Sequence, residues 1–158
     1  MKQIFLAIQD RLSTMVPALR YIDKNWNQLN LPQPPVQWPC CLIDLDSVEY
    51  SQTSSLDRLA TAHISLLVAD QHTVRSSAKA PAKTDAYDIL DVLEDIMEAL
   101  EGWHIPDTTQ ALTRSNLSKA YRDQSYDVYT LIFDTAWVER QPDNSATASP
   151  SFHIVTEP

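Results

Sequence analysis

Asp44 and Asp46 are the two residues whose spacing most resembles a catalytic pattern. They alternate with Ile43 and Leu45 at the period of a half-buried strand, so both carboxylates are expected on one face. Paired carboxylates, with Glu49 nearby, are ligands that hard cations bind in metal-dependent nucleases and other hydrolases. However, the sequence offers no evident third ligand or general base, and alternating acids are also typical of a solvated sheet face. We expect the solvated face, and we predict no catalytic or metal-binding residue.

Glycine-dependent chemistry is excluded by composition. The chain has 158 residues and one glycine, Gly102, beside ten prolines, whereas average usage would make glycine about 7% of the chain. The dinucleotide fingerprint, the phosphate-binding P-loop and the nucleophile elbow each need more than one glycine at fixed spacing. These enzyme classes are therefore ruled out, and we expect no cofactor.

The charge and the cysteines limit the partners and the compartment. Twelve Lys and Arg residues against 21 Asp and Glu residues give a formal net charge of −9, which disfavours binding to nucleic acid or to anionic lipid. The adjacent Cys40 and Cys41 have no zinc-binding spacing and fit a reducing compartment. No apolar run approaches the length of a membrane span. We therefore expect no membrane anchor and no sequence-specific contact with nucleic acid.

An acidic helix and a basic cluster are the strongest candidates for a binding surface. Residues 85–103 carry acids at helical spacing and no Lys or Arg, so like charges are neighbours on one face. The usual explanation is a solvated face. The alternative is a contact between copies, because the basic cluster of one copy would complement the acidic face of another in a head-to-tail ring. The predicted interface residues are Asp91, Asp95 and Glu98 on the helix, and Arg114, Lys119 and Arg122 in the basic cluster.

Residues 71–83 have neither the helical nor the strand period and are predicted to form a mobile loop. Its basic residues are Arg75, Lys79 and Lys83, and we expect the loop to become ordered only on assembly. The four histidines are scattered, without metal-ligand spacing. Trp26, Trp38 and Trp103 are expected to anchor loops or fill the core.

The elements that position these residues follow from periodicity. Ile4, Ile8, Leu12 and Met15 form the apolar stripe of a first helix, which Pro17 ends. A short edge strand at residues 19–23 and a proline-rich connection at 25–39 come next. Alternation predicts strands at 41–50 and 59–70.

The second half of the chain is predicted to begin with a long helix over residues 85–103, with Gly102 near its C-terminal cap. Strands at 112–122 and 126–138 then form a hairpin. The predicted fold is α+β: a mostly antiparallel sheet of about four to five strands, covered by the long helix, with a short N-terminal helix. Residues 1–140 are expected to form one domain, and residues 141–158 a loosely held C-terminal tail.

This order of elements resembles the tail terminator and tail completion proteins of long-tailed phages and prophages. The resemblance rests on the short N-terminal helix, the helix at 87–102, and three strands: residues 39–46 (PCCLIDLD), 62–70 (AHISLLVAD) and 126–134 (YDVYTLIFD). It covers residues 1 to about 140. The long proline connection and the segment 141–158 depart from the general pattern of the family.

The resemblance implies a non-enzymatic virion protein that assembles as a ring of copies, typically a hexamer. Such a ring caps the finished tail tube and joins it to the head-side connector, so the expected partners are other copies, the major tail (tube) protein and the connector. Assembly is expected in the bacterial cytoplasm, and the protein then belongs to the virion tail. Two alternatives stay open: a small metal-dependent hydrolase or nuclease using Asp44 and Asp46, and a monomeric adaptor whose acidic helix binds a basic protein.

Overall fold

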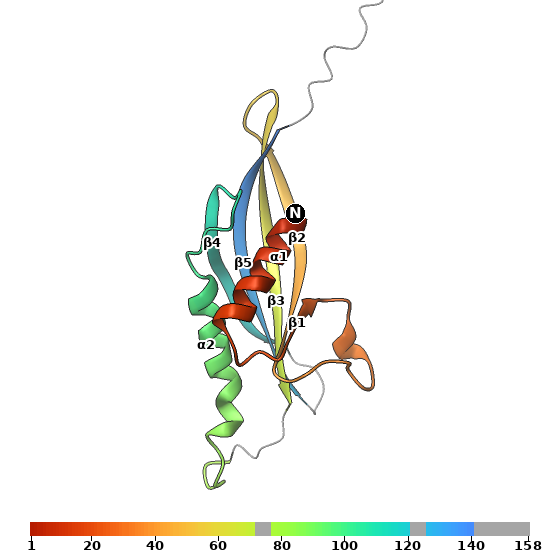
Figure 1. Ribbon diagram of the computed structural model, residues 1–158, viewed down its shortest axis with the longest axis vertical. Helices are drawn as coiled ribbons and strands as arrows, with labels where there is room; N and C mark the ends of the chain where they lie inside the picture. The colour runs from red at the N-terminus through yellow and green to blue at the C-terminus, as the bar shows by residue number, and fades with distance from the viewer. Residues whose placement is uncertain (72–76, 121–125, 141–158) are drawn as a thin grey trace, which may run out of the picture.

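The helix α1 (Lys2–Met15) lies diagonally across one face of a five-stranded sheet, as Figure 1 shows for the computed structural model. The structure describes residues 1–71, 77–120 and 126–140. The strands are β1 (Tyr21–Lys24), β2 (Cys40–Gln52), β3 (Asp57–Gln71), β4 (Gln110–Ala120) and β5 (Tyr126–Arg140). The second α-helix, α2 (Asp88–Leu100), follows a 3-10 turn at Asp85–Tyr87, and a further 3-10 turn covers Gln28–Asn30.

The strand order is β1-β2-β3-β5-β4. β1 pairs with β2 in parallel, whereas the pairs β2 with β3, β3 with β5 and β4 with β5 are antiparallel. A bulge interrupts β2 between Leu45 and Ser47, and β4 has two irregularities along its pairing with β5. Because bulges bend a strand and increase its twist, both outer strands of the long hairpins curve.

The main core lies between the sheet and the two helices. α1 buries Ile4, Ile8 and Leu12, while alternate residues of the central strands, including Ile64 and Phe133, bury their side chains on the same side. α2 contributes an apolar side to this cluster and contacts α1, β3 and β4. The apolar residues that recur every 3.6 positions in the helices therefore pack against the apolar residues that alternate along the strands. Together they form one core between the helices and the sheet.

The opposite face of the sheet is covered at one end by the proline-rich connection. Leu29 is 1% exposed and packs with Cys40, Leu42, Ala69 and Val128 in a second cluster. The rings of Trp38 and Tyr126 stack with centroids 5.3 Å apart, and the Tyr126 hydroxyl donates a hydrogen bond to the carbonyl of Leu29. The connection is thus tied to the start of β5 by aromatic packing and a hydrogen bond.

The predicted fold class was wrong. The sheet is mixed, because β1 and β2 are parallel. Parallel neighbours need a long connection that returns the chain to the starting end of the first strand. Residues 25–39 form this connection, so β2 starts beside β1 and runs in the same direction. The predicted long helix is also absent from the described residues. Residues 85–87 form a 3-10 turn, α2 has 13 residues, and the 14-residue α1 is the helix that crosses the sheet.

The end of α2 explains part of that difference. Glu101 leaves helical geometry with ψ of 126°, and Gly102 follows with φ of +72°. Glycine adopts this left-handed conformation without the steric cost that a Cβ brings. Gly102 N–H then donates to the carbonyl of Leu112 at 2.8 Å, and Leu112 N–H donates to Trp103 at 2.9 Å. The single glycine therefore turns the chain out of α2 towards β4.

The predicted boundary between residues 1–140 and 141–158 stays a prediction, since residues 141–158 lie outside the described residues. The helices that the structure describes include none that is both long and apolar enough to cross a membrane.

Candidate assembly surfaces

The carboxylates of Asp44 and Asp46 each have a neutral hydrogen-bond partner. Asp44 Oδ2 accepts from Asn25 Nδ2 at 3.3 Å, and Asp46 Oδ1 accepts from Ser65 Oγ at 2.7 Å. Ser65 is the register partner of Asp44, and Asp46 lies at the bulge of β2. Nowhere in residues 1–71, 77–120 or 126–140 do three His, Cys, Asp or Glu side chains gather into a group that could hold a metal ion. The two acids are therefore arranged as polar groups of a partly exposed strand.

A His–Asp pair on the sheet is the polar contact that sequence reasoning missed. His63 Nδ1 lies 2.7 Å from Asp134 Oδ1, and the two residues are register partners on β3 and β5. Both side chains are about one-third exposed or less, at 33% and 27%. Only the register brings these residues together, since they are far apart in the sequence. The alternation along each strand was the available signal, but it gives no pairing by itself.

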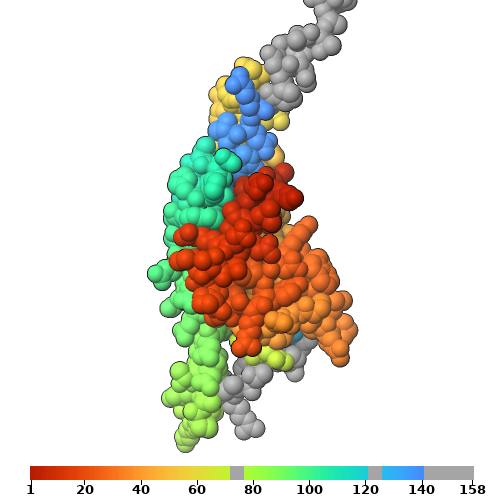
Figure 2. Space-filling model, viewed as in Figure 1, coloured from red at the N-terminus to blue at the C-terminus, as the bar shows by residue number. Residues whose placement is uncertain are grey.

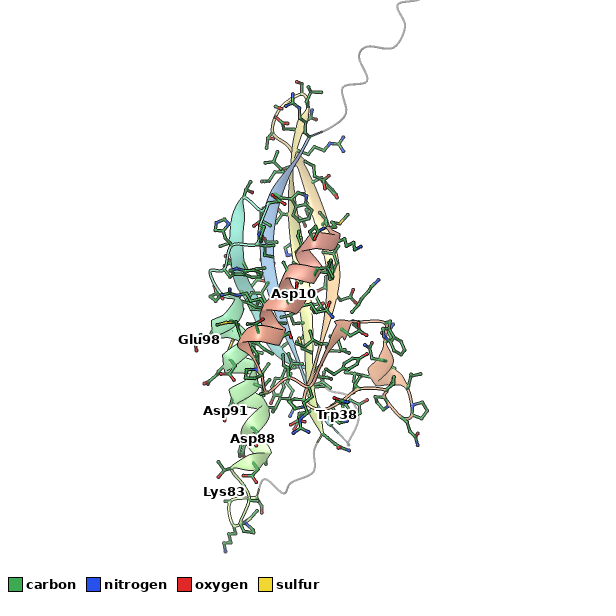
Figure 3. The ribbon with its side chains drawn as sticks, in the orientation of Figure 1. Asp10, Trp38, Lys83, Asp88, Asp91 and Glu98 are labelled. Atoms are coloured by element: carbon green, nitrogen blue, oxygen red, sulfur yellow. The ribbon has the colours of Figure 1, made fainter. Side chains whose placement is uncertain are left out.

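The acidic residues of α2 point away from the protein's own core. Asp91, Asp95 and Glu98 are exposed, and Figure 3 shows Asp91 and Glu98 on the side of α2 that faces away from α1. Within α2 the structure places no basic residue in the last turn. The exposed side of α2 therefore carries an acidic stripe formed by Asp91, Asp95 and Glu98.

The predicted basic cluster is engaged within its own chain. The guanidinium of Arg114 donates to the Met97 sulfur on α2, and its backbone N–H donates to Glu101 Oε2 at 3.1 Å. Lys119 Nζ forms an ion pair with Asp127 Oδ1 at 2.5 Å, and this hydrogen bond raises the pKa of Lys119 above its ordinary value. Both side chains remain exposed at the sheet edge. Arg122 lies outside the described residues.

A group of acids lies where β3 ends and β5 begins, near the start of α2. Asp70 is the register partner of Asp127. Burial raises the pKa of the Asp70 carboxyl, as do the nearby charges of Asp88 and Asp127, while the N–H of Gln71 and the charge of Arg20 act in the opposite direction. This end of the sheet therefore holds like charges at close range.

The predicted assembly loop is described in part. Lys79 and Lys83 are exposed and belong to successive turns, in which Ala80 N–H donates to the carbonyl of Ser77 at 2.8 Å. Arg75 lies outside the described residues. The order of this loop on assembly stays a prediction.

The sheet has open edges in the described structure at two strands, β4 and the part of β2 beyond the end of β1. β1 pairs with β2 only as far as Ile43, so residues 44–52 of β2 have a neighbour on the β3 side alone. β4 pairs with β5, and no described strand lies beyond it. An open edge presents unpaired N–H and C=O groups, which another strand can complete. These edges are the candidate sites for strand addition.

A shallow groove of about 580 Å³ lies beside the open edge of β2, between that strand and α1. Its apolar lining comes from Met1, Phe5, Leu6 and Leu45. Its polar lining comes from α1, β1 and β2: Lys2, Gln9, Asp23, Lys24 and Asp44. Met1 and Leu6 are 59% and 40% exposed. Figure 2 shows the N-terminal half of α1 on the surface above this strand. Sequence reasoning did not find the groove, because its lining combines residues of three separate elements.

Comparison with known proteins gives one kind of match. No protein-family model matches the sequence, and no curated protein does. Among solved structures, a chain of the structure described as the virion of the native gene transfer agent (GTA) particle matches with a TM-score of 0.56. The match covers 84% of this chain and 92% of that chain. This protein shares the fold of a chain in a virion. At 13% sequence identity, the likeness establishes the fold and leaves the role to be inferred.

Proposed function

We propose that this protein is a structural component of a phage or prophage virion, and that it caps the tail tube as a ring of copies joined to the head-side connector. The observation that carries the proposal is the fold shared with a chain of the gene transfer agent virion, which extends over nearly the full length of both chains. The protein would assemble in the bacterial cytoplasm and remain in the virion tail.

The open sheet edges support assembly from copies. A protein whose sheet has open edges at β4 and at the part of β2 beyond β1 has the means to extend that sheet through its neighbours. In a ring of identical subunits, one surface of each copy contacts a different, complementary surface of the next copy. The family resemblance implies a hexamer, which is the ring size that we propose.

The acidic side of α2 supports a role in binding a protein at one end of such a ring. Asp91, Asp95 and Glu98 form an exposed, unbalanced stripe. A basic surface on the major tail protein or on the connector would complement this stripe and favour rapid, oriented association. In a ring the stripe is repeated in every copy, so a weak individual contact becomes a strong combined one.

Deletion of the gene from a strain that produces the particles tests the proposal. We expect tails of irregular length that are not joined to heads, when particles are viewed by negative-stain electron microscopy. Expression of the wild-type chain from a plasmid should restore joined particles. Tails of normal, uniform length attached to heads in the deletion strain would contradict the proposed role.

A further inference from the structure

We propose that the open edge of β4 in one copy adds to the open edge of β2 in the next copy as an antiparallel strand. This inference rests on the proposed ring and names the surfaces that build it. The occupant of the β2 edge is thus β4 of a second copy of this chain. Four observations, on the edges, their direction, their charge and the groove, lead to this assignment.

Each of the two edges has backbone N–H and C=O groups that another strand can pair with. β1 ends at Lys24, opposite Ile43, so no described strand lies beside residues 44–52 of β2 on the outer side, although Leu45 N–H already donates to Asp44 Oδ1. β4 has 11 residues, of which all but Ala111, Leu112 and Ala120 are exposed. The backbone groups of Leu112 and Arg114 are already bonded to residues 101–103, so the available edge of β4 is residues 115–120. This length still allows several ladder hydrogen bonds with β2.

The strand directions fit a ring. β2, β3, β5 and β4 are antiparallel at each step, so β4 runs opposite to β2. Rotation about an axis along the strands keeps the direction of each strand. It therefore brings β4 of one copy beside β2 of the next as an antiparallel pair, with the helices of both copies on the same side of one continuous sheet.

The charges select unlike edges. Residues 44–52 contain Asp44, Asp46 and Glu49 and no basic residue, whereas β4 contains Arg114 and Lys119 and no acidic residue. Two β2 edges would repel one another, and so would two β4 edges. Arg114 of β4 is attracted to the acids of the β2 edge, whereas Lys119 is already paired with Asp127 in its own chain, so the attraction between unlike edges rests on Arg114.

The groove beside β2 matches an apolar residue on β4. Leu117 is 46% exposed and is the register partner of Leu131, a core residue on the helix side of the sheet. In a continuous sheet, Leu117 of the added strand would thus lie on the side where Leu45, Phe5 and Leu6 line the groove. Burial of these exposed side chains is the apolar part of the contact.

The acidic stripe of α2 fits less well as the partner of β4 in another copy. Arg114 already contacts Met97 of α2 in its own chain, and Lys119 is paired with Asp127. A second α2 would have to displace the first, whereas the part of β4 that follows Arg114, residues 115–120, can pair through its backbone without any rearrangement of these side chains.

Cross-linking of two separate cysteine variants tests the contact. Ser47 on β2 and Ser115 on β4 are both exposed, and Cys40 and Cys41 are buried. The purified Ser47→Cys and Ser115→Cys full-length chains are mixed at high concentration and treated with a short bis-maleimide. We expect dimers with one copy of each variant, and none from either variant alone. Ser13→Cys, exposed on α1, is the matched control with Ser115→Cys and should give none.

The outcomes are decisive for the assignment. Dimers from Ser115→Cys alone would indicate a two-fold contact between β4 edges and overturn the inference. So would the absence of mixed dimers in the concentrated mixture. A chain that carries both substitutions should give a ladder of cross-linked species, because each copy has both partners of the contact.

Charge exchange separates the β2 edge from α2. Glu49→Lys or Arg114→Glu alone should weaken association by about tenfold, as expected for a change of ~1.4 kcal/mol, and the two together should restore it. Asp95→Lys makes the same charge change on α2 and should leave the mixed dimer unchanged. A loss with Asp95→Lys and none with Glu49→Lys would instead assign the contact to α2. Thermal melts establish that each variant folds.

The contact and the proposed role can fail independently. Mixed dimers together with normal tails in the deletion strain would retain the edge contact and reject the role in tail capping. Defective tails in that strain, without mixed dimers, would retain the role and reject the edge contact.

Discussion

The guanidinium of Arg11 lies 4.6 Å from the centroid of the Trp103 ring. Arg11 Nε also donates to the carbonyl of Ala99 in the last turn of α2, at 2.5 Å. α2 has no basic residue of its own in that turn, and the carbonyl end of a helix is stabilised by a positive charge. α1 therefore supplies the cation that α2 lacks, and this contact fixes the two helices relative to one another.

Arg11→Ala should lower the free energy of unfolding by about 1–2 kcal/mol, because it removes a charged hydrogen bond and a cation–π contact. Chemical denaturation measures the change. Arg11→Lys keeps the charge but lacks the Nε–H donor, so it should recover only part of the loss. Lys2→Ala, at an exposed position of the same helix, is the control. Equal stabilities of all three variants would argue against the contact.

Gly102→Ala should destabilise the protein by about 1 kcal/mol, since a Cβ is disfavoured at φ of +72°. Apart from Gly102 itself and its neighbours in the chain, no described atom lies within 4 Å of the position that the Cβ would occupy, so the cost comes from the backbone conformation. Gly102→Asn should cost less, because asparagine tolerates the left-handed region. Thermal melts of the two variants test this order, and an alanine variant as stable as wild type would refute it.

Asp70→Asn should stabilise the protein at neutral pH, and the gain should shrink as the solution is acidified. The pKa of Asp70 is raised in the folded state, so the folded chain holds this proton more tightly than the unfolded chain. Stability attributable to Asp70 therefore increases as pH falls through the folded pKa towards the ordinary value of 3.8. Melting temperatures at several pH values compare this variant with Asp10→Asn on the exposed side of α1. A gain independent of pH would exclude this origin.

Cys40 and Cys41 should resist thiol-reactive dyes in the native protein. Both are 0% exposed, and burial raises the pKa of the Cys40 thiol to about 12, so the reactive thiolate is scarce at neutral pH. Denaturant should expose both thiols to labelling. Rapid labelling of the folded protein would be inconsistent with this burial.

Replacement of Asp91, Asp95 and Glu98 together by lysine should impair particle assembly without unfolding the chain. The three acids are exposed, and like charges at helical spacing cost stability, so the melting temperature should not fall. Plasmid complementation of the deletion strain gives the readout. Normally joined particles would show that the stripe is merely solvated.

The local elements could be predicted from the sequence, and their arrangement could not. The stripe Ile4, Ile8 and Leu12 is the buried side of α1, and the alternating segments form β2 and β3 with slightly wider limits. In contrast, the parallel pairing of β1 depends on where the proline-rich connection returns the chain, and no local period encodes that path.

Of the candidate surfaces, those that lie on one element could be predicted from the sequence, and those that combine several elements could not. The exposure of Asp91, Asp95 and Glu98 follows from their position opposite the apolar side of α2. The contact of Arg114 with Met97 and the groove beside Leu45 arise from tertiary packing, which brings together elements that are distant in the sequence.

The opposite directions of β2 and β4 have a consequence for the polarity of an assembly. In the molecule, the β2–β3 turn lies at one end and the start of α2 at the other (Figure 1). Copies related by rotation about the strand direction all place the same end on the same side. A ring built from these edges would therefore have two chemically distinct faces, one formed by hairpin tips and one by acidic helix starts. A single chain can in this way discriminate between two different neighbours along the axis of a particle.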